Sequence, residues 1–125
     1  MTRTLVTGGT GFLGRHVVAR LVEAGREVRV LARESSDVGG LGAVEVVRGD
    51  VTRRDDLERA LDGVQRVFHM AAETRDGQPD DLYDGVNHQA VATLLDLASA
   101  MGVERFLHTS HYYAIGRSGE PRSVP

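Results

Sequence analysis

The sequence contains no cysteine and no tryptophan, and all 15 of its lysine-or-arginine residues are arginine. Without cysteine, disulfide bonds, thiolate metal sites and a cysteine nucleophile are excluded within these 125 residues. Without lysine, a P-loop lysine and Schiff-base chemistry are excluded as well. The chemistry open to this chain is therefore limited to arginine, histidine, tyrosine, hydroxyl groups, carboxylates and the backbone.

Long apolar runs and an excess of positive charge are also lacking. No run approaches the length that spans a membrane, and the N-terminus has no signal-peptide pattern. A net charge of −3 gives no reason to expect a nucleic-acid partner. His108 and His111 lack a third ligand at suitable spacing, so no metal is expected. We therefore expect a cytoplasmic protein without a membrane, nucleic-acid or metal partner.

Glycine, in contrast, is abundant, and three glycines form one turn. Gly8, Gly11 and Gly14 lie between a short apolar run and an amphipathic helical pattern. Glycine lets the backbone turn tightly and approach a ligand, and the following helix directs free N–H groups at the turn. This order predicts a phosphate-binding turn. The alternative is a turn that only allows helix and sheet to pack closely, for which Gly14 alone would suffice.

Runs typical of strands and helices alternate along the chain. Strands are expected over 3–7, 28–32, 44–47, 67–70 and 105–109, and helices over 12–24, 52–62 and 81–101. With right-handed crossovers this alternation predicts an α/β fold, a doubly wound parallel sheet in the order 3-2-1-4-5. The glycine turn then falls where the strand order reverses, which is the usual ligand position. We expect a single domain over 1–125, in which 110–125 is partly irregular.

Local patterns predict finer details of the helices. Thr52 and Asp55 have the spacing of a capping box, in which a hydroxyl satisfies the first backbone N–H groups of a helix. Apolar spacing places Leu13 on the inner face of the first helix and Met101 on that of the last.

Small and polar residues follow the strands in a recognisable order. Asp50 follows the third strand, His69-Met70-Ala71-Ala72 follows the fourth, and Asn87 lies in the long helix. With the glycine turn, they make the chain resemble the N-terminal portion of the extended short-chain dehydrogenase/reductases. This is the NAD(P)-dependent epimerase/dehydratase group, which includes dihydroflavonol-reductase-like enzymes. The resemblance implies a Rossmann domain that binds a nicotinamide dinucleotide. It also implies hydride transfer to or from a carbonyl or hydroxyl of an unknown small-molecule substrate.

The resemblance also implies which residues meet the cofactor. Those around the pyrophosphate are Gly8, Thr10, Gly11, Phe12, Leu13 and Gly14. Those at the adenine are Asp50 and Val51, with Asp50 accepting from the amino group. Those on the nicotinamide ribose side are Met70, Ala71 and Ala72. Asn87 supports the site, and Thr109, at the end of the last strand, completes the set.

The end of the second strand bears on the choice of cofactor. Enzymes that select NAD usually place an acidic side chain there, where it binds the ribose hydroxyls. This chain has Arg33, and a guanidinium suits a 2′-phosphate. NADP(H) is therefore predicted over NAD. If the turn is shifted by one residue, Glu34 would meet the ribose and reverse this choice.

The catalytic residues of the family are incomplete here. The family uses a Tyr-x-x-x-Lys helix, and a Ser or Thr after strand five. His111 occupies the usual serine position, Ser110 is one residue early, and the chain has no lysine. Tyr113 and Arg117 stand four residues apart, but the intervening Gly116 disfavours the helix that would pair them. We therefore assign no catalytic residue.

Two functions fit this pattern. The first is an NADP(H)-binding lobe of an oxidoreductase or epimerase that is not competent alone. The alternative is a non-catalytic dinucleotide-binding sensor or regulatory module. The strand over 105–109 ends the predicted sheet and exposes Phe106 and Leu107 along an open edge. We expect reduced stability, self-association into a homo-oligomer through that edge, or both.

Overall fold

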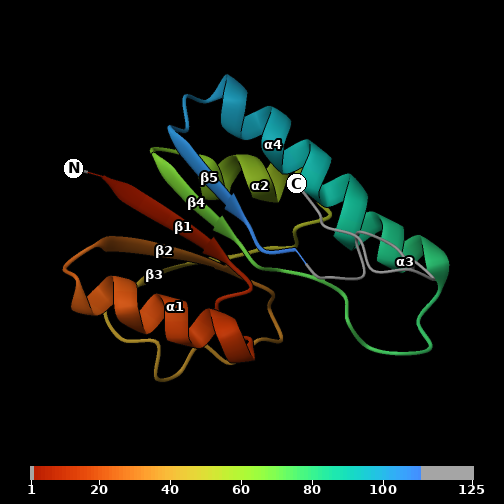
Figure 1. Cartoon of the computed structure of the whole chain (residues 1–125), viewed down its shortest axis with the longest axis horizontal. Coiled ribbons are helices and arrows are strands. Elements are labelled where there is room, and N and C mark those ends of the chain that lie inside the picture. Colours follow the sequence, from red (N-terminus) through yellow and green to blue (C-terminus); the bar gives the residue numbers. More distant parts are fainter. Residues whose placement is uncertain (1, 111–125) are drawn as a thin grey trace, which may run out of the picture.

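A five-stranded parallel sheet forms the centre of the computed structural model, which describes residues 2–110 (Figure 1). His111, Tyr113 and Arg117 lie outside the described residues. The strands are β1 (Arg3–Thr7), β2 (Glu27–Ala32), β3 (Glu45–Arg48), β4 (Arg66–His69) and β5 (Arg105–His108). Their order is β3-β2-β1-β4-β5 and every neighbouring pair is parallel, so the predicted doubly wound α/β sheet is confirmed.

Helices cover both faces of this sheet. They are α1 (Phe12–Glu23), α2 (Arg54–Leu61), α3 (Asp80–Asp84), the π-helical segment η1 (Gly85–Gln89) and α4 (Ala90–Ala100). The last three follow one another without a break and form one long rod (Figure 1). Helix α1 lies on one face of the sheet, and α2 and α4 lie on the other (Figure 1).

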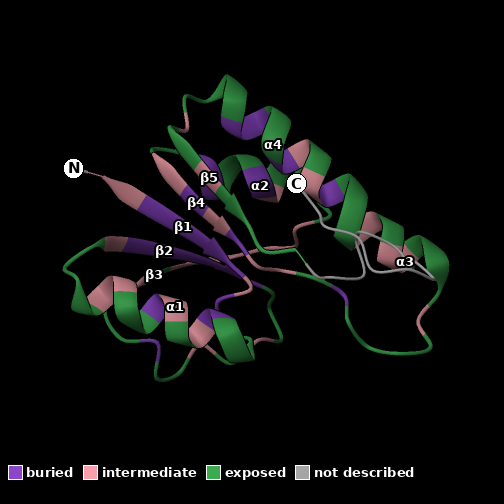
Figure 2. Cartoon of the chain, viewed as in Figure 1, coloured by how far each residue is buried: buried purple, intermediate pink, exposed green. Residues whose placement is uncertain are grey.

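The core consists of two apolar clusters, one on each face. Successive strand residues point to opposite faces, so an apolar run in a central strand fills both clusters. Leu5 joins the cluster with α2 and α4, and Val6 joins the cluster with α1. Both side chains are fully buried. Figure 2 shows buried residues concentrated in β1 and β2, with exposed residues along the outer sides of α1 and α4.

Two residues that were predicted to lie on the inner faces of the first and last helices are exposed instead. Leu13 is 52% exposed and Met101 is 40% exposed. Helix α1 instead turns Gly14 and Val18 toward the sheet, four residues apart on one stripe. Leu13 lies about 100° around the helix from Gly14 and therefore faces outward.

The predicted capping box at Thr52 is also wrong. Helix α2 begins at Arg54, and no side chain caps it. The N–H and the hydroxyl of Thr52 both donate to Oδ1 of Asp50, at 2.8 and 2.7 Å. This local turn satisfies Thr52 before the helix starts, which is how short polar side chains compete with capping.

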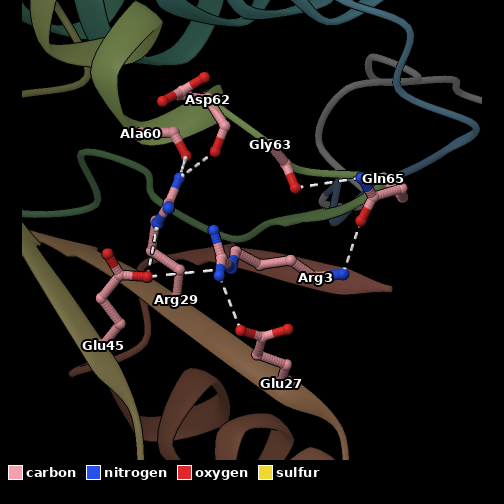
Figure 3. A network of polar contacts seen from close by, with 8 residues as sticks. All are labelled: Arg3, Glu27, Arg29, Glu45, Ala60, Asp62, Gly63 and Gln65. Carbon is pink, nitrogen blue, oxygen red and sulfur yellow. Dashed lines mark hydrogen bonds and ion pairs between the residues drawn. The ribbon is translucent and has the colours of Figure 1, made fainter. Parts of the chain in front are cut away.

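A buried arginine attaches α2 to the sheet. Arg29 on β2 is 5% exposed, and its Nε donates to Oε2 of Glu45 at 3.0 Å. Its Nη1 donates to the carbonyls of Ala60 and Asp62 at 2.8 and 2.6 Å (Figure 3). These carbonyls lie at the C-terminal end of α2, where carbonyls lack helical partners and a positive charge is favourable. Arg29 therefore supplies donors to the free carbonyls at the end of α2, and Glu45 balances its charge.

Arg3 extends this network across the start of the sheet. Its Nη2 donates to Oε1 of Glu27 at 2.7 Å, which lowers the pKa of that carboxyl. Its backbone N–H donates to Oε1 of Gln65 at 2.7 Å, just before β4 (Figure 3). The network holds the amino ends of the strands, opposite the ends where the glycine turn lies.

One face of the sheet is less covered beside β5. Among the strands that the structure describes, β5 pairs only with β4, and Leu107 is 54% exposed. A groove of about 560 Å³ runs there between α1 and the strands β4 and β5. Within residues 2–110, every helix is too short or too polar to cross a membrane.

Replacing Arg29 with methionine should cost about 2–4 kcal/mol of unfolding free energy, because it leaves two helix-end carbonyls and Glu45 without their donor. Arg54→Met is the matched control, since Arg54 is 62% exposed and its one ion pair within the described part of the chain is with Glu58 on the same helix. The control should lose less than about 0.5 kcal/mol. Urea unfolding of both variants measures the difference, and equal losses would contradict the role given to Arg29.

Candidate functional site

The glycine turn brings three backbone segments into close contact. Gly8 has a φ of +69°, and a Cβ there would lie 2.6 Å from the carbonyl carbon of Met70. A Cβ on Gly14 would lie 1.9 Å from the oxygen of Gly8. Both distances are shorter than real Cβ atoms tolerate, so these two positions require glycine for packing. The first turn of α1 is thereby fixed against the ends of β1 and β4.

Gly11 differs from its two neighbours in the motif. Among residues 2–110, a Cβ there would meet only the oxygen of Gly8, at 3.4 Å, an ordinary contact distance. Its φ of −76° is open to any residue. Gly11 is the N-cap of α1, so free N–H groups of the helix lie beside it. Packing explains Gly8 and Gly14, but it does not explain glycine at position 11.

The hydroxyl of Thr7 holds the end of β4 beside the turn. Its Oγ1 accepts from the N–H groups of Met70 and Ala71, at 3.0 and 3.2 Å, and lies 2.6 Å from Nδ1 of His69. Because two N–H groups occupy the oxygen, its own proton goes to His69, whose Nδ1 must accept it. His69 is therefore neutral, with its proton on Nε2. The sequence analysis treated Thr7 only as a strand residue and missed this role.

His69 is fully buried under the carboxyl ends of the strands. Burial lowers its pKa to about 4, and the neighbouring His108 contributes in the same direction. The two rings stack with centroids 5.6 Å apart. Nε2 of His69 has no hydrogen-bond partner among the residues that the structure describes. Its environment is that of a packed, uncharged side chain.

Asp50 is oriented by the start of α2. Its backbone N–H donates to Oδ2 of Asp56 at 2.9 Å, which lowers the pKa of Asp56. Its own Oδ1 accepts both bonds from Thr52. A Cβ on Gly49 would lie 2.8 Å from Cβ of Asp56, so glycine before Asp50 permits this close approach. In these contacts Asp50 uses Oδ1 and leaves Oδ2 without a described partner.

The loop after β4 is fixed by Asn87 of η1. Oδ1 of Asn87 accepts from the N–H of Glu73 at 2.8 Å, and its Nδ2 donates to the Glu73 carbonyl at 3.0 Å. The Glu73 carboxylate accepts from Nε and Nη2 of Arg75, both at 2.9 Å, and this pairing lowers its pKa to about 2. Tyr83 donates its hydroxyl to the Arg75 carbonyl. Sequence reasoning missed Glu73 and Arg75, because loop residues carry no periodic signal.

A cleft of about 390 Å³ lies at the carboxyl ends of β1 to β4, between these segments. Of the residues predicted from the sequence, it is lined by Gly8, Thr10, Gly11, Arg33, Asp50, Val51, Met70, Ala71 and Ala72. The opposite wall adds Glu73, Thr74, Arg75, Leu82 and Val86. Residues far apart in the sequence therefore meet around one cavity.

The other predicted site residues lie off the cleft lining. Phe12 is 88% exposed at the start of α1, and Leu13 points outward beside it. Gly14 lies beneath Gly8. Asn87 acts through Glu73, and the N–H of Thr109 donates to the His69 carbonyl at 3.1 Å. Residues 2–110 contain no group of three or more histidine, aspartate or glutamate side chains that could hold a metal.

Comparison with known proteins identifies the family. The model of the NAD dependent epimerase/dehydratase family matches residues 4–124, so the chain belongs to this family. The resemblance to extended short-chain dehydrogenase/reductases is thereby confirmed. Sterol demethylase protein B of Methylococcus capsulatus is 43% identical over 117 residues, which are 90% of this chain and 35% of that protein.

Solved structures agree with this membership. A short-chain dehydrogenase/reductase superfamily protein from Agrobacterium tumefaciens, with bound NAD, is 39% identical with a TM-score of 0.75. The match covers 85% of this chain and 31% of that one. The Bordetella bronchiseptica enzyme WbmG, in complex with NAD, is 28% identical with a TM-score of 0.84, over 94% of this chain and 40% of that one. The chain thus spans about a third of the length of these relatives.

Gly14→Ala should destabilise the fold by about 3 kcal/mol or more, because the new methyl would overlap the Gly8 oxygen. Gly11→Ala is the matched control, since the same methyl meets only an ordinary contact. It should cost about 1 kcal/mol or less, mostly through the weaker N-cap. Thermal unfolding compares the two variants. A Gly11→Ala protein as unstable as Gly14→Ala would show that packing requires both glycines.

Stability should fall between pH 6.5 and 4 because His69 is neutral in the fold. Its folded pKa of about 4 lies below the ordinary 6.5, so the unfolded chain binds the proton first as the pH drops. The stability that neutral His69 contributes is fully present above pH 6.5. It is lost toward pH 4 at about 1.4 kcal/mol per pH unit. From pH 7.5 to 5.0, urea unfolding should show a loss of about 2 kcal/mol from this group.

His69→Asn should remove that loss, since the amide oxygen still accepts from Thr7 but does not titrate in this range. The buried Glu73 has its pKa lowered to about 2, so its contribution is lost only below about pH 4.5 and does not interfere. An unchanged slope in His69→Asn would mean that His69 is not the group responsible.

Proposed function

We propose that this chain is the NADP(H)-binding lobe of an oxidoreductase or epimerase of the extended short-chain dehydrogenase type. The observation that carries the proposal is Gly11, a glycine at the N-cap of α1 that internal packing does not require. It leaves the cleft floor bare beside free helix N–H groups, which is the surface a diphosphate needs. Relatives solved with bound NAD support a nicotinamide dinucleotide as the ligand.

Each part of the cleft suits one part of such a cofactor. The backbone of Gly8, Thr10 and Gly11 would hold the diphosphate at the N-terminus of α1. Asp50 and Val51 would meet the adenine, with the unused Oδ2 of Asp50 accepting from its amino group. On the nicotinamide ribose side, the cleft would offer Met70, Ala71 and Ala72. The bound nicotinamide would supply or accept the hydride.

Arg33 supports NADP(H) over NAD. It lines the cleft directly after β2, whereas Glu34 does not line it. The Arg33 guanidinium has no ion-pair partner among residues 2–110, so it is free to bind a 2′-phosphate with charge-assisted bonds. This geometry favours Arg33 over the shifted turn that would present Glu34.

Chemistry would require groups that this sequence lacks. The general acid/base of the family is a tyrosine whose pKa a nearby lysine lowers, and the chain contains no lysine. A dinucleotide-binding sensor is the second candidate, favoured by His111 at the position where the family carries a serine. Sequencing of the gene beyond codon 125 discriminates the two. An encoded Tyr-x-x-x-Lys helix supports the enzyme, and a stop codon supports the sensor.

Calorimetric titration should show NADPH binding about tenfold or more tightly than NADH, because one charge-assisted contact is worth about 1.5–3 kcal/mol. Arg33→Ala should weaken NADPH about tenfold and leave NADH within about twofold. Gly11→Ala is the control, because its methyl would face the diphosphate that both cofactors share. It should therefore weaken the binding of NADPH and NADH alike. Equal or tighter binding of NADH by the wild type would reject the preference for NADP(H).

A further inference from the structure

The connection from β2 to β3, residues 33–44, forms the cleft wall that carries Arg33. Arg33 and Ser36 both line the cleft, and the N–H of Ser36 donates to the Arg33 carbonyl at 3.0 Å. The residues between them, Glu34 and Ser35, are exposed. The first part of the connection, 33–37, contains no apolar side chain, whereas Val38, Leu41 and Val44 pack on the core cluster beside α1. The shape of 33–37 must therefore come from polar contacts with other elements.

Arg48, at the end of β3, makes two of these contacts. Its Nη1 donates to the carbonyls of Arg33 and Ser36, each at 2.8 Å. Both bonds start from one nitrogen atom, so one group fixes both ends of the turn. Arg48 does not line the cleft itself.

Arg15, on α1, holds the next part of the same loop. Its Nη2 donates to the Asp37 carbonyl at 2.7 Å and its Nη1 to the Gly39 carbonyl at 3.1 Å. Its Nε donates to the carbonyl of Thr10, in the glycine turn, at 3.1 Å. Three different nitrogens of one planar group therefore join the loop to the turn. Arg15 also lies off the cleft lining.

We infer that Arg15 and Arg48 are positioning residues that act on cofactor binding through the backbone of this loop, an inference that rests on the proposed function. Arg48 sets the selectivity for NADP(H), and Arg15 sets the affinity for both cofactors. Arg48 fixes the carbonyl of Arg33 and thereby the direction from which its guanidinium enters the cleft. Arg15 holds the loop at a set distance from the turn that binds the diphosphate. The 2′-phosphate therefore meets a preformed site, in which little ordering is required on binding.

The two arginines should respond differently to lysine. A lysine ammonium carries three donors on one nitrogen, so it can replace the Nη1 of Arg48, which makes both bonds alone. It cannot replace Arg15, whose bonds leave from three nitrogens in a fixed plane. A role for charge alone predicts that lysine serves equally well at both positions. The comparison therefore separates geometry from charge.

The experiment measures the dissociation constants of NADPH and NADH by calorimetry for the full chain and its variants, with melting temperatures recorded alongside. Arg48→Met should reduce the preference for NADPH about fivefold, and Arg48→Lys should restore it to within about twofold. Arg15→Lys should weaken both cofactors about fivefold, since the Thr10 carbonyl is released together with the loop. Arg20→Met, at an exposed position of α1, is the control and should change neither affinity.

A double variant tests the route of the effect. In an Arg33→Ala background, Arg48→Met should not change the NADPH to NADH ratio further, because Arg48 acts through Arg33. A purely structural role for Arg48 would instead lower both affinities and the melting temperature in either background. The inference is overturned if Arg48→Met keeps the wild-type NADPH to NADH ratio, or if lysine serves equally well at positions 15 and 48. It is also overturned if the effects of Arg48→Met and Arg33→Ala on this ratio add. A wild-type chain that binds neither cofactor would reject the proposed function itself.

Discussion

The carbonyl oxygen of Gly8 lies where a side chain at position 14 would begin, and this contact fixes the rest of the cleft. It sets how near α1 approaches the end of β1, and Gly8 in turn lies against the backbone of Met70 and Ala71. Two packing contacts thus place the helix N-terminus, β1 and β4 relative to one another. The free N–H groups of α1 consequently point at a space whose walls are already determined.

Polar contacts complete what packing begins. The Thr7 hydroxyl orders the first residues after β4, and Asn87 orders the next ones through the backbone of Glu73. At the opposite end of the strands, Arg29 joins β2 to α2. In a chain without lysine, arginine forms most of the ion pairs among the described residues, and its several donors let one side chain bind two or three acceptors.

The strand order was predictable because it depends on features that sequence shows directly. Short runs rich in β-branched residues, such as 28–32, are typical of buried strands, and right-handed crossovers then leave one simple arrangement. The turn at Gly8 to Gly14 was equally visible, and eight of the residues named from it and from the family pattern line the cleft, together with Arg33 at the end of the second strand. Local motifs predicted the position of a residue correctly where no other side chain competed for its contacts.

The errors and omissions arose where a tertiary or local contact decided the outcome. Thr52 matches a capping box, but Asp50 binds its hydroxyl first. Leu13 fits an apolar stripe, but the close approach at Gly14 rotates α1 about that point. Glu73, Arg75, Arg15 and Arg48 act through loop carbonyls or with each other, and no spacing rule marks such pairs in advance.

The π-helical segment has a consequence for how this lobe tolerates change. Five residues, Gly85–Gln89, hold one wider turn between α3 and α4, and Asn87 projects from it to the loop after β4. An ordinary helix advances about 100° per residue, so removal of a single residue here would restore the regular winding and rotate α3 relative to α4. Leu82, which lines the cleft, would then turn away from it. Loss of one codon in this stretch would dismantle a wall of the pocket and leave the sheet intact.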